Sequence, residues 1–152
     1  MDLAALYKEW ASRLLGYTMS ITRDRHLAED ALQNLFVKLA TSGVDVKNHA
    51  VYLFRAARNE ALNLSKRKGP RPLPLADILA PEESAGSQVD PAELTSALDK
   101  LPEEQSEVVI LHIVEGLPFK EIAEITGCSL DTAASRYRYA LEKLKELLRP
   151  WT

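Results

Sequence analysis

The chain has 152 residues, a length that allows one domain or two small ones. Of these residues 46% are hydrophobic and 27% charged, and the formal net charge is −3. Its single cysteine, Cys128, excludes an intramolecular disulfide and a zinc site built from cysteines, and its three separated histidines show no metal-ligand spacing. Because the N-terminus lacks a basic region followed by an apolar core, and no apolar run reaches the roughly 20 residues that span a bilayer, we expect a cytoplasmic protein without a signal peptide, membrane insertion, metal or other cofactor.

Charge is unevenly distributed along the chain. Residues 1–68 hold 11 Lys and Arg against 7 Asp and Glu, whereas residues 69–99 hold one Arg against six acidic groups. Residues 100–152 hold 7 basic and 9 acidic groups. A basic first third and an acidic middle fit a protein that meets DNA within a larger assembly, without enough charge for tight independent binding.

Apolar residues at three- and four-residue steps predict three helices in the first third of the chain. They cover residues 2–20, with Asp2 as a cap, residues 26–41, with Asp24 as a possible cap, and about 48–66, with a loop over 41–47. The predicted inner positions are Leu3, Leu6, Tyr7, Trp10, Leu14 and Tyr17 in the first helix, Leu27, Ala28, Ala31, Leu32, Leu35 and Leu39 in the second, and Ala50, Leu53, Phe54, Ala57, Ala61 and Leu64 in the third. Phe36 falls at the edge of the second stripe.

The polar sides of the second and third helices differ in chemistry. The second carries Glu29, Asp30, Gln33, Asn34 and Lys38, which indicate either a solvated face or a protein contact. The third carries an aromatic residue among cations and amides, a combination that can stack a base and hold phosphates of single-stranded DNA. These residues are Tyr52, Arg55, Arg58, Asn59, Asn63, Lys66, Arg67 and Lys68. The alternative is a helix whose C-terminal cations are favoured by its dipole.

Residues 69–91 hold five of the eight prolines and predict an extended, acidic linker between two small domains. The second domain starts with a short helix over 92–100. A further helix starts at Leu101-Pro102, has a body that includes Val108, Leu111 and residues 112–114, and ends at Gly116.

The stretch 117–148 predicts a helix, a tight turn and a second helix. Pro118 suits the first turn, Gly127 a left-handed position after the helix, and Ser129 the cap of the next helix. The last helix has an inner side of Ala133, Tyr137, Ala140, Leu141, Leu144, Leu147 and Leu148, and small or basic residues elsewhere. This layout is typical of a DNA reader in the major groove, although helix-turn-helix geometry is also used structurally.

Three stretches together resemble the extracytoplasmic-function (group 4) sigma factors of the sigma-70 family. The first is Ala28-Glu29-Asp30-Ala31-Leu32-Gln33-Asn34-Leu35-Phe36-Val37-Lys38-Leu39, which looks like the polymerase-binding helix of that family. The second is Tyr52-Leu53-Phe54-Arg55-Ala56-Ala57-Arg58-Asn59-Glu60-Ala61-Leu62-Asn63, which resembles the melting and −10 segment. The third, Leu101-Pro102 through Leu144, is similar to the −35 domain.

The resemblance implies an all-α chain with a sigma-2-like domain at 1–68, a linker at 69–91 and a sigma-4-like helix-turn-helix domain at 92–152. It implies polymerase contacts by Asp30, Gln33, Asn34, Phe36 and Lys38 and −10 contacts by Lys47, Asn48, Tyr52, Arg55, Arg58, Asn59, Lys66 and Arg67. It implies −35 contacts by Ser129, Asp131, Thr132, Ser135, Arg136 and Arg138. The implied partners are the β′ and β subunits of core RNA polymerase, promoter DNA and an anti-sigma factor, with this chain a monomer.

Four positions depart from the family pattern: Ala134 stands where Lys or Arg is usual, Tyr139 where Arg is frequent, Asn63 where Asp is frequent and Asn34 where Glu is usual. The leading hypothesis is an alternative sigma factor without catalysis of its own. The alternatives are a sigma-like decoy that sequesters an anti-sigma factor and a dimeric helix-turn-helix repressor. We do not expect an enzyme, because no nucleophile with a base and no Gly-rich phosphate loop is visible.

Overall fold

The computed structural model describes residues 2–42, 48–68 and 91–148. Every regular element in these ranges is helical, which confirms the all-α prediction. Contacts divide the chain into two compact units, Met1–Leu73 and Pro74–Thr152. The predicted linker over 69–91 lies almost wholly outside the described residues, so the domain boundaries at 68 and 92 stay predictions.

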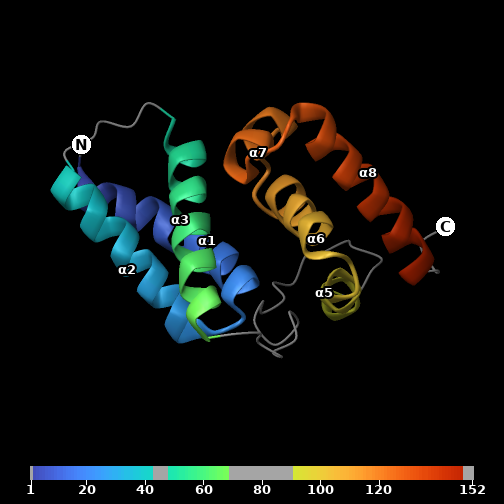
Figure 1. Ribbon diagram of the computed structural model, residues 1–152, viewed down its shortest axis with the longest axis horizontal. Coiled ribbons are helices and arrows are strands. Elements are labelled where there is room, and N and C mark those ends of the chain that lie inside the picture. The colour runs from blue at the N-terminus through green and yellow to red at the C-terminus, as the bar shows by residue number, and fades with distance from the viewer. Residues whose placement is uncertain (1, 43–47, 69–90, 149–152) are drawn as a thin grey trace. The chain divides into compact units, whose positions relative to one another are not determined.

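The first unit is a bundle of α1 (Leu3–Thr22), α2 (Arg25–Ser42) and α3 (His49–Lys68), each of which packs on the other two (Figure 1). Short polar side chains cap the N-terminal ends of α1 and α3. Asp2 Oδ1 accepts from the Ala5 N–H at 3.2 Å, and Asn48 Oδ1 accepts from the Val51 N–H at 3.3 Å. Such caps satisfy backbone donors that have no partner within the helix.

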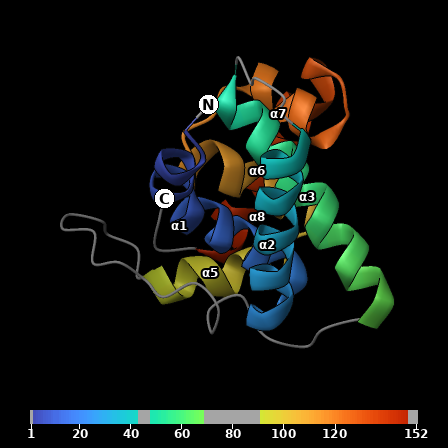
Figure 2. The same ribbon diagram turned by 90° about the vertical axis from the view of Figure 1, so that its left-hand side faces the viewer.

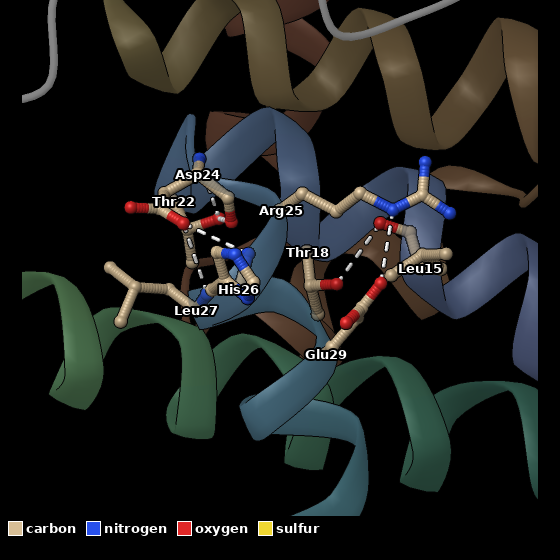
Figure 3. A network of polar contacts seen from close by, with 8 residues as sticks. All are labelled: Leu15, Thr18, Thr22, Asp24, Arg25, His26, Leu27 and Glu29. Carbon is tan, nitrogen blue, oxygen red and sulfur yellow. Dashed lines mark hydrogen bonds and ion pairs between the residues drawn. The ribbon is translucent and has the colours of Figure 1, made fainter.

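The turn between α1 and α2 is a compact polar network (Figure 3). Asp24 Oδ1 accepts from the His26 and Leu27 N–H groups at 2.9 and 3.2 Å, which confirms Asp24 as the cap of α2. The buried Thr22 hydroxyl donates to the Asp24 carbonyl at 2.9 Å. Arg23 between them has a φ of 54°, a left-handed conformation that L-residues rarely adopt. This network fixes the residue at which α2 starts and therefore which of its side chains face outward.

The core of the first unit contains most of the predicted inner residues. Tyr17 and Phe54 are fully buried with ring centroids 5.3 Å apart, and Trp10 meets the same Phe54 ring edge-on at 6.2 Å. The Arg13 guanidinium lies 4.5 Å from the Trp10 ring centroid. Tyr7 is an exception to the predicted inner stripe, because 55% of it is exposed. Ser42 belongs to α2, although the sequence predicted a loop there.

The second unit contains α5 (Pro91–Asp99), α6 (Glu103–Val109), a π-helical turn η1 (Ile110–Val114), α7 (Phe119–Thr126) and α8 (Leu130–Leu147). Figure 2 shows helices α5 to α8 from a second direction. Its core includes Val108, Leu111, Ile122 and Ala140, all without measurable exposure.

Two details of the second unit differ from the sequence prediction. Pro118 is the extended residue that precedes α7, with a ψ of 156°, and not a residue of the first turn. The predicted inner residue Leu147 is 38% exposed. By contrast, the predicted inner residue Leu148 is buried. The Ser106 hydroxyl of α6 donates to the Leu98 carbonyl of α5 at 2.6 Å, which connects these two helices.

Candidate functional site

Three surfaces carry the residues that the sequence predicted to be functional. The first is the outer face of α2, where Asp30, Gln33 and Asn34 are all exposed. Their spacing of three and four residues places them side by side on one face of the helix. Val37, 62% exposed, continues this face one turn further on. Sequence reasoning missed Val37, although it is an apolar residue that falls outside the inner stripe.

Two further predicted residues of α2 have partners within the first unit. Phe36 is only 8% exposed and packs edge-on against Tyr7 of α1, with ring centroids 5.1 Å apart, so it belongs to the core of the unit. Lys38 extends across to α3, where its ammonium group forms an ion pair with the carboxylate of Glu60. The structure therefore brings Asp30, Gln33 and Asn34 together, and gives Phe36 and Lys38 partners within the unit.

The second surface is a stripe along one side of α3. We define the α3 stripe as Asn48, Tyr52, Arg55, Asn59 and Lys66, which follow one another at helical spacing. Tyr52 is half-buried and the other four are exposed. From Asn48 to Lys66 the stripe extends about 27 Å, at 1.5 Å per residue.

Of the remaining residues of the predicted −10 set, the structure describes the side chain of Arg58. Arg58 is half-buried and lies on a neighbouring side of the helix. Lys47 and the side chain of Arg67 lie outside the described residues. The α3 stripe thus combines one aromatic ring, two amides and two cations on one side of a single helix.

The third surface is the helix-turn-helix formed by α7 and α8. Gly127 has a φ of 74°, and its N–H donates to the Ala123 carbonyl at 2.9 Å, which ends α7 as predicted. Ser129 caps α8, because its Oγ accepts from the Thr132 N–H at 3.0 Å. The Ser129 hydroxyl also donates to the Thr132 hydroxyl oxygen at 2.8 Å. Two of the predicted DNA contacts therefore build the N-terminus of α8.

The outward side of α8 presents three of the other predicted contacts: Asp131 and Arg138 are exposed and Ser135 is half-buried. Arg136, also half-buried, lies about 160° around the helix from Arg138. Ala134 lies on the same side as Arg138 and leaves a position without charge. The Arg138 guanidinium lies 5.4 Å from the ring centroid of Tyr139, which is itself 53% exposed. Sequence reasoning recorded Tyr139 as a lost cation, and the structure adds a cation–π pair at this position.

Within residues 2–42, 48–68 and 91–148, no cluster of three His, Cys, Asp or Glu side chains could hold a metal ion. The same ranges include no helix whose length and apolarity would let it cross a membrane.

Comparison with known proteins identifies the family to which the chain belongs. Residues 6–71 match the family Sigma-70 region 2, and residues 92–144 match Sigma-70, region 4. The chain is 30% identical to the RNA polymerase sigma factor CarQ of Myxococcus xanthus, over 94% of this chain and 87% of that protein. It is 31% identical to the ECF RNA polymerase sigma-E factor of Haemophilus influenzae, over 80% and 74% of the two chains.

A solved structure has the same fold. The sigma factor RpoE of Bartonella quintana, crystallised with the anti-sigma factor NepR, aligns over 99% of both chains with a TM-score of 0.76 at 24% identity. The chain belongs to the extracytoplasmic-function RNA polymerase sigma factors of the sigma-70 family. It is an alternative sigma factor that directs transcription initiation, and it is not an enzyme.

Proposed function

We propose that this protein reads its promoters with two separate surfaces: a melted −10 strand along the α3 stripe and a −35 duplex with α8. The observation that carries this proposal is the composition of the α3 stripe, in which Tyr52 lies between amides and cations on one side of a helix. Single-stranded DNA is held by this chemistry, because a ring stacks on any base while cations follow the phosphates.

Each residue of the α3 stripe then has a distinct task. The Tyr52 ring stacks on an unpaired base, and Arg55 and Lys66 neutralise phosphates about three turns of helix apart. Asn48 and Asn59 offer amide donors and acceptors to base edges. Lys47, Arg58 and Arg67 are assigned to the same strand by the family pattern. Extrusion of a base into this surface costs a few kcal/mol of stacking, which the polymerase-bound complex compensates.

At the −35 element, α8 enters the major groove by its N-terminal half. The capped N-terminus at Ser129 and Thr132 favours a phosphate, because its backbone N–H groups carry partial positive charge. Asp131 can accept from a cytosine amino group, while Ser135, Arg136 and Arg138 supply donors to bases and phosphates. Since Ala134 provides no cation, we assign much of the charge at this surface to the two arginines.

The polymerase contact is assigned to the outer face of α2. Asp30, Gln33 and Asn34 meet the coiled coil of β′ directly, whereas Phe36 and Lys38 contribute by packing against Tyr7 and pairing with Glu60. The second unit would contact β. We assign the protein to the cytoplasm as a monomer, with an anti-sigma factor that covers these faces as a further partner.

A decoy that sequesters an anti-sigma factor is the second candidate function. One observation favours it: Ala134 and Tyr139 leave the outward side of α8 with fewer cations than the family pattern has. The exposed Asp30, Gln33 and Asn34 together with the cations of the α3 stripe favour the sigma role, because a promoter is opened only when the polymerase and the melted strand are both held.

The proposal is tested by strand opening in a reconstituted holoenzyme. Reactivity of −10 thymines toward permanganate reports melting, and we expect Arg55→Ala to lower it at least several-fold while core binding stays unchanged. Lys8→Ala is the matched control, since Lys8 is an exposed cation of a different helix, α1. Equal opening by both variants contradicts the assignment of the α3 stripe. Failure of the unsubstituted protein to bind core polymerase favours the decoy.

A further inference from the structure

Three rings meet where the π-helical turn, α7 and α8 come together in the second unit. We call His112 of η1, Phe119 of α7 and Tyr137 of α8 the aromatic triad. The His112 and Phe119 rings are stacked, with centroids 4.4 Å apart and planes 18° apart. Tyr137 meets His112 edge-on at 4.7 Å and Phe119 at 5.2 Å. One imidazole thus contacts both helices of the helix-turn-helix.

The same imidazole holds the backbone that leads into α7. His112 Nδ1 lies 2.9 Å from the Leu117 carbonyl oxygen, and because that oxygen can only accept, Nδ1 carries the proton. On its other side, the Leu117 N–H donates to the Leu111 carbonyl at 3.0 Å. Leu117 directly precedes Pro118, the N-cap residue of α7. Both peptide groups that flank Leu117 are therefore anchored to η1.

The π-helical turn explains how His112 can contact both helices and also bond to the Leu117 carbonyl. The Glu115 N–H donates to the Ile110 carbonyl at 3.1 Å, a five-residue step that is wider than an α-helical turn. Gly116, with a φ of 69°, then reverses the chain, so Leu117 returns beside His112. π-Helical turns are rare and are frequently found at functional sites.

We propose that His112 is a positioning residue for −35 recognition. Its Nδ1–H bond sets the start of α7, and its ring packing sets the rotation of α8 about Tyr137. Tyr137 is flanked in sequence by Arg136 and Arg138, so a small rotation of α8 at this point moves both guanidinium groups relative to the duplex. This inference rests on the proposed function, because it assigns to α8 the contacts with the −35 element.

Three substitutions separate the hydrogen bond from the ring. His112→Phe keeps an aromatic ring and removes the donor, whereas His112→Asn keeps an amide donor at nearly the position of Nδ1 and removes most of the ring. His112→Ala removes both. His26→Ala is the matched control, because His26 is an exposed histidine of the first unit.

Each full-length variant is assembled with core polymerase and titrated with two probes, a duplex with only the −35 element and a single strand with only the −10 element. For the −35 duplex we expect losses of between about twofold and tenfold for His112→Phe and His112→Asn, and a larger loss for His112→Ala. Affinities for core polymerase and for the −10 strand should stay unchanged, which excludes unfolding of the first unit, and unchanged amide exchange of the buried Ile122 excludes unfolding of the second. In addition, ¹⁵N NMR of the unsubstituted protein should show the neutral ring of His112 protonated on Nδ1.

The inference is overturned if His112→Ala binds the −35 duplex as well as the unsubstituted protein does, or if the ring proton is on Nε2. It is also overturned if all three substitutions weaken both probes equally, since His112 would then be only structural. If the unsubstituted holoenzyme shows no preference for the −35 duplex, the proposed function fails and not the placement of His112, which the NMR measurement reads separately.

Discussion

Replacement of Gly127 by alanine should destabilise the second unit through the backbone alone. Gly127 has a φ of 74°, and a Cβ added there would meet no heavy atom within 4 Å, so no clash contributes to the effect. A left-handed conformation costs an L-residue about 1–2 kcal/mol. Alanine also narrows the unfolded ensemble, which offsets about 0.4–1 kcal/mol of that cost. We therefore expect Gly127→Ala to lower the free energy of unfolding by about 1 kcal/mol.

Gly16 is the matched control, because the same substitution there should have the opposite sign. Gly16 lies inside α1 at ordinary helical angles, and its added Cβ also meets nothing within 4 Å. Glycine in a helix interior is less stable than alanine by about 0.5–1 kcal/mol, so Gly16→Ala should stabilise the first unit by that amount.

Native-state amide exchange of the full-length protein measures both effects in their own unit. The fully buried Ile122 reports on the second unit and Leu14 on the first. The left-handed geometry at Gly127 is refuted if Gly127→Ala leaves the exchange of Ile122 unchanged or slows it. Asparagine tolerates this conformation, so Gly127→Asn should lose less stability than Gly127→Ala.

Three further predictions concern a helix cap and two surfaces. Asp24→Ala removes both cap bonds of α2 and should cost about 1 kcal/mol in the first unit, measured by urea titration of Trp10 fluorescence in a Trp151→Phe background; an unchanged midpoint would contradict the cap. Tyr139→Arg adds a cation, so it should raise the affinity for the −35 duplex and make the slope of log K against log salt steeper by about 1; an unchanged slope would place Tyr139 away from the phosphates. Asp30→Lys should weaken core-polymerase binding about tenfold or more without altering binding of the isolated protein to DNA, as titration with labelled core would show; unchanged core affinity would exclude the α2 face.

The sequence predicted the helix boundaries well wherever one short side chain or one glycine determines them. Asp2, Asp24, Ser129 and Gly127 occupy the predicted positions, because capping depends on residues only two to four apart. For the same reason the exposure of Asp30, Gln33 and Asn34 was predicted correctly, because it follows from helical spacing alone.

Contacts between elements were harder to predict. The ion pair of Lys38 with Glu60 joins residues 22 apart in sequence, and the packing of Phe36 on Tyr7 joins residues 29 apart, so no local pattern marks either pair. Tyr7 itself was predicted to lie inside because it fits the stripe, yet it lies at the rim of the bundle.

The π-helical turn was also not predicted from the sequence, and it changes the direction of the side chains that follow it. An additional residue in the turn rotates the following side chains by about 100° relative to an α-helix. Ile113 and Val114 lie within this turn and are 55% and 66% exposed, although the sequence placed them in the body of an apolar helix. The aromatic triad depends on this same turn, so the role proposed for His112 could not be predicted from spacing.

The most direct test of the central claim is run-off transcription with bacterial core polymerase and a promoter library, with and without this protein. We predict transcripts from a defined pair of −35 and −10 elements that depend on the protein. Polymerase that binds the protein and yields no such transcripts would contradict the sigma role and favour the decoy.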